Sequence, residues 1–294
     1  MGVLRSIATC AELVRREGVR GYGRALRRLP QLPRFVRWHA LPPGSEVECL
    51  LDGRLRMRLS ASDQSIARRI FINGTFEPRL LEFMRESVGE GAVAVDVGAN
   101  VGVHTLTLAE RVGPRGAVHA FEPSAAYERL AANVELNGFA ERVRLNRAAV
   151  GAAPGTLRLQ ECAPGYEAFT SAGRPLAHAK VTGATFEVPL VTLDEYFEAC
   201  GVTAADFLKV DVEGYEAEVL RGARRLLERR AARRIMLEIS DPLLEGCGTS
   251  AAEVFGILRR AGYTTWLLDA ATGRLEECPV PRPTDDSTLV AMAP

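Results

Sequence analysis

The sequence predicts an α/β fold in which a mostly parallel sheet carries helices on both faces and a basic helical arm precedes the sheet. Strand and helix patterns alternate from residue 92 onward, as they do in chains that build parallel sheets. The strand segments are almost uniformly apolar, which is typical of strands buried on both faces. A length of 294 residues suits one large domain with a helical extension.

Charge and composition narrow the classes of partner. Lys+Arg and Asp+Glu both number 37, and this zero net charge argues against nucleic acid as the main partner, because phosphate binding usually leaves a basic excess. The six cysteines form no close pair at metal-ligand spacing, so we expect reduced thiols in a cytoplasmic protein. No apolar run approaches the roughly 18–20 residues that span a bilayer, so we expect no transmembrane segment.

Residues 1–45 differ from the rest of the chain. Nine arginines and only two acidic residues lie between Met1 and Ala40, and a broken helical stripe of apolar residues ends at several prolines. We therefore expect a basic helical arm at 1–45, followed by one domain at 46–294. Such an arm is solvated, packs in a homodimer or contacts an anionic membrane surface.

The expected elements follow in order. The segment 46–59 alternates around Asp52-Gly53 and predicts a β-hairpin. Apolar runs then predict strands at 92–97, 117–121, 143–145, 207–212 and 235–239. Helical periodicity predicts helices at 103–112, from Ser124 to near Gly138, from Val219 to Leu227 and from Ser250 to Arg260. Segments 263–268 and 287–292 predict a closing antiparallel pair, which puts one antiparallel strand at the sheet edge. Residues 161–187 are rich in Gly, Ala and Pro and are expected to cover a substrate.

A glycine loop lies where the first buried strand turns into a helix. It is Val95-Asp96-Val97-Gly98-Ala99-Asn100-Val101-Gly102, and Glu122 closes the following strand. Ligands of open parallel sheets bind beyond the carboxyl ends of the strands. Gly98 and Gly102 allow a close backbone approach, and a carboxylate about 20 residues on suits the hydroxyls of a ribose. The pattern predicts a nucleoside ligand.

The loop spacing indicates which nucleoside. Dinucleotide sites carry Gly-x-Gly-x-x-Gly, whereas this loop has Gly-x-Asn-x-Gly, and Asp96 would repel a pyrophosphate. S-adenosylmethionine brings an ammonium, a carboxylate and a sulfonium, which these groups accommodate better. The sequence therefore predicts a S-adenosylmethionine site rather than a nicotinamide site.

A second motif, Lys209-Val210-Asp211-Val212-Glu213-Gly214-Tyr215-Glu216, ends the fourth of these strands. In a strand, Lys209, Asp211 and Glu213 would share one orientation. A charged row in a buried strand is costly unless it is paired or functional. Glu238, at the end of the fifth strand, is expected next to this row. The row forms either an internal ion pair or part of a site.

These motifs together resemble the FkbM-type family of S-adenosylmethionine-dependent methyltransferases over about residues 60–240. The resemblance rests on Val95–Gly102, Phe121-Glu122-Pro123, Asn133 with Asn137, Val191–Asp194, Lys209–Glu216, Val219-Leu220, Gly222-Ala223 and the pair Phe76-Glu77 ahead of the loop. The Lys-x-Asp-x-Glu-Gly-x-Glu run is its specific part, because similar glycine loops occur in many methyltransferases.

The resemblance implies a Rossmann-like class I methyltransferase fold with a seven-stranded sheet and O-methylation of hydroxyls on sugars, polyketides or other secondary metabolites. It implies a cofactor site in which Asp96, Gly98, Asn100 and Gly102 hold the methionine part and Glu122 holds the ribose. The adenine would border 147–149, including Ala148. Glu77 joins these cofactor-binding residues, and Asp211 would lie nearest the methyl group.

A hydroxyl acceptor must lose a proton, so a base is expected. Asp211 is the first candidate, followed by Glu213 and Glu238, with His104 and His178 as alternatives. A divalent metal on Asp211 and Glu238 is an option that the sequence does not favour, because no His-carboxylate cluster accompanies it. Two alternatives remain. The acceptor group is an amine or a carboxylate, or the protein is a non-catalytic partner subunit that binds the cofactor.

Overall fold

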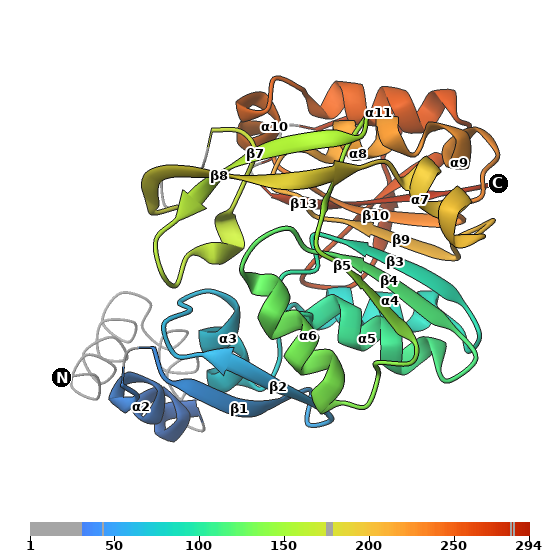
Figure 1. Ribbon diagram of the computed structural model, residues 1–294. Helices are drawn as coiled ribbons and strands as arrows, with labels where there is room; N and C mark the ends of the chain where they lie inside the picture. The colour runs from blue at the N-terminus through green and yellow to red at the C-terminus, as the bar shows by residue number, and fades with distance from the viewer. Residues whose placement is uncertain (1–30, 43, 175–178, 283, 285) are drawn as a thin grey trace, which may run out of the picture. The chain divides into compact units, whose positions relative to one another are not determined.

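The computed structural model describes residues 31–42, 44–174, 179–282, 284 and 286–294, and it contains two compact units, Met1–Phe76 and Glu77–Pro294 (Figure 1). Most of the predicted basic arm lies outside the described residues. The N-terminal unit contains more than that arm, because the predicted hairpin belongs to it as well.

The N-terminal unit consists of α2 (Leu32–Ala40), β1 (Glu46–Leu51), β2 (Leu55–Ser60) and α3 (Ile66–Asn73). The predicted hairpin is confirmed, since β1 and β2 pair antiparallel from Glu46–Ser60 to Leu51–Leu55. Asp52 (φ 52°) and Gly53 (φ 70°) both have left-handed backbones, as a tight hairpin turn requires.

The C-terminal unit is built on an eight-stranded sheet with the order β12-β11-β13-β10-β9-β3-β4-β5. Its strands are β3 (Val93–Val97), β4 (Ala117–Phe121), β5 (Val143–Asn146), β9 (Phe207–Val210), β10 (Arg234–Ile239), β11 (Thr264–Leu268), β12 (Leu275–Glu277) and β13 (Ser287–Met292). Strands β5, β4, β3, β9 and β10 are parallel neighbours, which confirms the predicted α/β, Rossmann-like fold.

Two details of the predicted sheet were wrong. The sheet has eight strands rather than seven, because the three-residue strand β12 adds an edge beside β11. The predicted antiparallel pair β11–β13 forms, but β13 inserts between β10 and β11 instead of lying at the edge. An inserted strand is covered on both faces, and Leu289, Val290 and Ala291 are accordingly inaccessible to solvent.

Helices cover both faces of this sheet (Figure 1), with α4, α5 and α6 on one side and α7, α8, α9 and α11 on the other. The helices are α4 (Pro78–Ser87), α5 (Val103–Val112), α6 (Ala126–Leu136), α7 (Leu193–Cys200), α8 (Glu216–Gly222), α9 (Arg224–Glu228), α10 (Asp241–Gly246) and α11 (Ala251–Arg260). The predicted helix from Val219 to Leu227 is interrupted at Ala223, so it forms parts of α8 and α9. The predicted cap of α11 is confirmed, because the Ser250 side chain accepts a hydrogen bond from the Glu253 amide.

Part of the predicted substrate cover is regular structure. Strands β6 (Ala149–Val150), β8 (Val181–Val191) and β7 (Gly155–Cys162) form a separate three-stranded sheet in the order β6-β8-β7. Strands β7 and β8 pair antiparallel over most of their length, and we call this pair the ribbon. The 3-10 helix η2 (Glu167–Phe169) follows β7. His178, an alternative base, lies outside the described residues.

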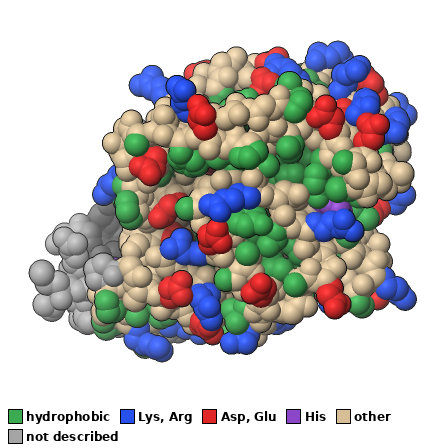
Figure 2. Space-filling view, in the orientation of Figure 1, with side chains coloured by type: hydrophobic (Ala, Val, Ile, Leu, Met, Phe, Trp, Pro, Cys, Tyr) green, Lys and Arg blue, Asp and Glu red, His purple; other side chains and the backbone are tan. Residues whose placement is uncertain are grey.

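Within the described ranges, no helix is both long enough and apolar enough to cross a bilayer. Basic and acidic side chains are interspersed on the face shown in Figure 2.

Candidate active site

The glycine loop joins β3 to α5 and packs against the turn that follows β9. The amides of Gly98 and Ala99 both donate to the Phe121 carbonyl oxygen, at 3.0 and 2.9 Å. Gly98 has φ 85°, and a Cβ atom there would lie 1.8 Å from the Asp211 carbonyl oxygen. Only glycine fits this contact, so Gly98 brings the two predicted motifs together at one edge of the sheet.

Gly102 also lies close to a neighbouring helix. Its φ is 98°, and a Cβ atom would lie 2.9 Å from Leu130 Cδ1 on α6. Gly98 is thus required by a backbone contact and Gly102 chiefly by its positive φ, whatever either contributes to a ligand.

Glu122 follows β4 and is 6% exposed. Its Oε2 accepts a 2.8 Å hydrogen bond from the Asn100 amide, and its Oε1 accepts another of 2.8 Å from the Ser124 amide. Burial raises the pKa of this carboxyl group, although both hydrogen bonds oppose the rise. The Ser124 side chain also hydrogen-bonds to Glu122, so three of the roughly four lone-pair sites of the carboxylate are occupied and Glu122 can still accept from one hydroxyl.

Asp96, Lys209 and Asp211 form a buried charged row at the ends of β3 and β9. Lys209 Nζ donates to Asp211 Oδ2 at 2.9 Å and lies 3.8 Å from Asp96 Oδ1. Asp96 is fully buried, and its Oδ2 accepts a 2.6 Å hydrogen bond from the Thr105 hydroxyl on α5. Burial alone would lower the pKa of Lys209, but the two carboxylates outweigh it and raise that pKa. The internal ion pair, one of the two alternatives that the sequence left open for this row, is therefore present.

The carboxyl groups around Asp211 have unlike pKa values. Burial would raise the pKa of Asp211, but the charge and hydrogen bond of Lys209 lower it. The negative charge of Asp211, followed by burial, holds the pKa of Glu238 well above its usual range. The two carboxyl groups hydrogen-bond to each other, and the protonated Glu238 is the donor. This is the arrangement of a carboxylate pair that shares one proton.

Glu213 departs from its predicted geometry. Strand β9 ends at Val210, two residues earlier than expected, and Glu213 takes a left-handed backbone with φ 54°. The strand alternation that predicted a shared orientation for Lys209, Asp211 and Glu213 therefore does not extend to Glu213. Burial, followed by the charge of Asp211, raises its pKa well above the usual range.

Glu216, the last residue of the second motif, shapes this turn, a role that the sequence analysis did not assign to it. Its side chain is 2% exposed, and Oε1 accepts from the amides of Val212 at 3.2 Å and Gly214 at 3.1 Å. Burial raises the pKa of Glu216 to about 7. An acidic residue in the first turn of a helix, just after a glycine, was the signal available for this role.

Glu77 and Ala148 are the two remaining residues predicted to bind the cofactor. Glu77 Oε2 is 3.5 Å from His104 Nε2 at the start of α5, and the Glu77 backbone is left-handed with φ 43°. The charge of His104 acts on the pKa of Asp211, which associates this pair with the charged row. Ala148 is 8% exposed and immediately precedes β6.

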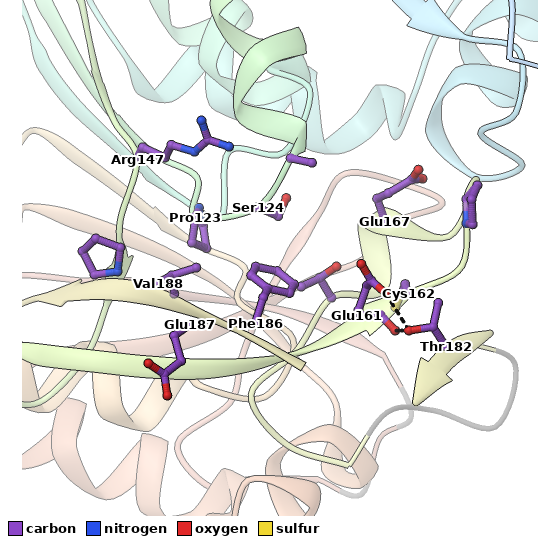
Figure 3. A pocket seen from close by; sticks show the side chains of 14 residues that line it. Pro123, Ser124, Arg147, Glu161, Cys162, Glu167, Thr182, Phe186, Glu187 and Val188 are labelled. Carbon is purple, nitrogen blue, oxygen red and sulfur yellow. Dashed lines mark hydrogen bonds between the residues drawn. The ribbon is translucent and has the colours of Figure 1, made fainter. Parts of the chain in front are cut away.

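A cavity of about 640 Å³ opens between the segment after β4 and the ribbon (Figure 3). Pro123, Ser124, Ala125 and Arg147 line one side, and the ribbon and the segment after β7 line the other. Arg147 is paired with Glu128 at 2.7 Å. The cavity therefore begins directly beside Glu122.

The described side chains include no group of three His, Cys, Asp or Glu that could hold a metal ion. Metal dependence stays an untested alternative.

Comparison with known proteins identifies the family. The model of the Methyltransferase FkbM domain matches residues 96–265, which contain the glycine loop, Glu122 and the charged row. The chain belongs to the FkbM methyltransferase family. The predicted family is thereby confirmed, and the predicted class I methyltransferase fold agrees with the strand order above.

Two relatives within this family match part of the chain. The 31-O-demethyl-FK506 methyltransferase FkbM of Streptomyces tacrolimicus is 30% identical over 199 residues, covering 59% of this chain and 73% of that protein. The methyltransferase sdnD of Sordaria araneosa is 33% identical over 153 residues, covering 44% of this chain and only 59% of that protein. A crystal structure of methyltransferase FkbM from Methylobacillus flagellatus has a TM-score of 0.41 and 16% identity, covering 76% of this chain and 52% of that one.

Proposed function

We propose that this FkbM-family methyltransferase takes the methyl group of S-adenosylmethionine and transfers it to a hydroxyl group of a small molecule. The observation that carries the proposal is the meeting of Glu122 and the Asp211–Glu238 pair around one glycine loop, beyond the carboxyl ends of adjacent parallel strands. One carboxyl group suits a ribose, and the pair suits proton removal.

The residues present fit this cofactor. Asp96 Oδ1 is buried and accepts no hydrogen bond from the described residues, so it has capacity for an ammonium group. Glu122 keeps acceptor capacity for a ribose hydroxyl beside its three hydrogen bonds within the protein. When bound, S-adenosylmethionine supplies an electrophilic methyl group on a sulfonium sulfur. Asp96, Gly98, Asn100 and Gly102 would hold the amino-acid part of this ligand.

Glu238 is our candidate for the base, ahead of Asp211. A base that works near neutrality needs a pKa near the operating pH. Lys209 lowers the pKa of Asp211, whereas Asp211 raises that of Glu238. Glu238 therefore holds and releases the proton, and Asp211 keeps Glu238 basic and oriented. This reverses the order expected from the sequence.

An oxygen acceptor is supported by the name of the Streptomyces relative, which describes methylation of an O-demethyl compound. The Asp211–Glu238 carboxyl pair also favours oxygen, because a hydroxyl acceptor needs the base that this pair offers.

The experiment is a transfer assay with S-adenosylmethionine carrying a ¹³C-methyl group. The acceptors are hydroxylated macrolides and sugars, each tested beside its deoxy and amino analogue. We expect the label on oxygen, with a methoxy carbon shift, and no label on the deoxy analogue. Label found on nitrogen or on a carboxylate would contradict the hydroxyl assignment.

A further inference from the structure

The cavity beside Glu122 has one wall that the proposed function does not use. Ser124, which donates its amide to Glu122, lines one side, together with Arg147 at the end of β5. The opposite wall is the ribbon, which contributes Phe186 and Val188 from β8. A ligand whose ribose contacts Glu122 would extend its base into this space.

Phe186 presents an aromatic ring to that space. It lies opposite Leu159 in the ribbon, and its half-buried side chain packs against the small apolar core formed by Ala149, Leu159 and Val188. Figure 3 shows the ring pointing toward the side of the cavity formed by Pro123 and Ser124. The Phe186 ring thus packs against the small apolar core on one side and faces the cavity on the other.

The neighbouring residue of β8 faces elsewhere. In Figure 3 the Glu187 side chain points away from the other side chains of the cavity, and it pairs with Arg158 at 3.3 Å. Alternate residues of a strand face opposite sides, so the exposed Thr185, which the cavity lining does not include, is the control position for Phe186 on the same strand.

The charges of the cavity suit an uncharged base rather than a phosphate. Arg147 is the one basic side chain among the lining residues, and it is already paired with Glu128 and lies over the Tyr127 ring. Two further carboxylates, Glu161 and Glu167, also belong to the lining, whereas the Glu187 side chain points away from it. Because Arg147 is already paired, the cavity offers no unpaired cation to a phosphate, and a phosphate would be repelled by the net negative charge of the lining. An uncharged nucleoside does not suffer this repulsion.

We propose that the ribbon forms the outer wall of the nucleoside site and that the Phe186 ring stacks on the adenine base of the cofactor. This inference rests on the proposed function, because it assumes an adenosyl ligand. Aromatic rings bind the faces of bases through stacking, which accounts for an aromatic side chain on an otherwise exposed strand. The ribbon is then a cofactor-binding element that the glycine loop and Glu122 do not include.

The test is calorimetric titration of the full chain with two ligands. S-adenosylhomocysteine contains both the nucleoside and the amino-acid part, and 5′-methylthioadenosine contains only the nucleoside. We expect Phe186→Ala to weaken both ligands by a similar factor, about tenfold or more. Thr185→Ala, the control on the same strand but outside the cavity lining, should change neither by more than about twofold. Phe186→Tyr keeps a ring and should bind like the wild type, and Phe186→Leu should weaken binding even if the alanine variant does not fold.

The outcomes separate this inference from the proposed function. If the wild type binds neither ligand, the adenosyl cofactor itself is wrong and the inference falls with it. If the wild type binds S-adenosylhomocysteine and folded Phe186→Ala and Phe186→Leu bind both ligands equally well, the ribbon wall is wrong while the cofactor stands. A rise only in the KM of the acceptor would also overturn the stacking role, because it would assign Phe186 to the acceptor.

Discussion

Gly98 contacts the backbone of Asp211 so closely that a Cβ atom on it would lie 1.8 Å from the Asp211 carbonyl oxygen. The amide of Asp211 in turn donates to the Val97 carbonyl oxygen at 3.0 Å. The loop after β3 and the turn after β9 are therefore one packed unit. Because the glycine is needed for this packing, its exchange should affect folding before it affects any ligand.

Gly98→Ala should lower the free energy of unfolding by roughly 3 kcal/mol or more, because it combines a left-handed backbone with a backbone clash. Gly138→Ala is the control, since Gly138 has φ 68° but no atom within 4 Å of its would-be Cβ. Backbone strain alone should cost that variant about 1 kcal/mol. Urea unfolding measures both, and equal losses would mean that the Asp211 contact yields without cost.

Lys209 neutralises two buried carboxylates, so its loss should be costly. Lys209→Met should destabilise the protein by roughly 3–5 kcal/mol, because Asp96 and Asp211 would be left buried without a cation. Adding Asp211→Asn should recover part of that loss. The control Arg233→Met breaks the exposed pair with Asp206 and should cost at most about 1 kcal/mol. If both single variants lose the same stability, the buried row is not an energetic ion pair.

Glu216 should make stability depend on pH. Its folded-state pKa of about 7 lies above the ordinary value of 4.5, so its contribution is fully present below pH 4.5 and is lost as the pH rises through 7. Glu216→Gln keeps an acceptor for the amides of Val212 and Gly214 but cannot ionise. The stability of the variant relative to the wild type should therefore rise between pH 4.5 and 7, by up to about 1.4 kcal/mol per pH unit, and then level off. Chemical unfolding across this range measures it, and a difference that stays flat would show that Glu216 is not held protonated.

The carboxyl pair predicts two different kinetic phenotypes. Glu238→Gln should reduce kcat by roughly 10²–10⁴-fold, as expected for a lost general base, while S-adenosylhomocysteine still binds. Asp211→Asn should instead shift the acidic limb of the kcat/KM profile to lower pH, because removing the negative charge of Asp211 lowers the pKa of Glu238. Stopped-time assays from pH 5 to 9 measure both. A Glu238→Gln enzyme with normal turnover would exclude Glu238 as the base.

Local signals in the sequence were enough for most of the fold. The bounds of α5 and β4 were predicted to the residue, because Gly113-Pro114 ends the helix and an apolar run bounds the strand. The Ser250 cap was likewise visible, since capping depends on residues three positions apart. The order in which strands pair is not a local property, so the insertion of β13 between β10 and β11 was not predictable from its apolar pattern.

The candidate site was predicted in membership but not in geometry. Alternating charges in 209–213 resemble a strand, yet β9 ends at Val210, and Glu216 accepts hydrogen bonds from the amides of Val212 and Gly214 in the turn that follows. The low pKa of Asp211 depends on its contact with Lys209, which spacing alone does not establish. The ribbon was missed because its residues 181–185 are exposed and carry no apolar alternation.

The central claim is that Glu122 and the glycine loop bind the nucleoside of S-adenosylmethionine. Calorimetric titration with S-adenosylhomocysteine tests it most directly. The wild type and the Glu122→Ala variant are both titrated, and reduced nicotinamide dinucleotide serves as the comparison ligand. We predict saturable binding of S-adenosylhomocysteine to the wild type and no binding of the dinucleotide. The variant should lose at least about tenfold in affinity, since charged hydrogen bonds contribute about 1.5–3 kcal/mol each. A folded wild-type protein that does not bind S-adenosylhomocysteine would contradict the account.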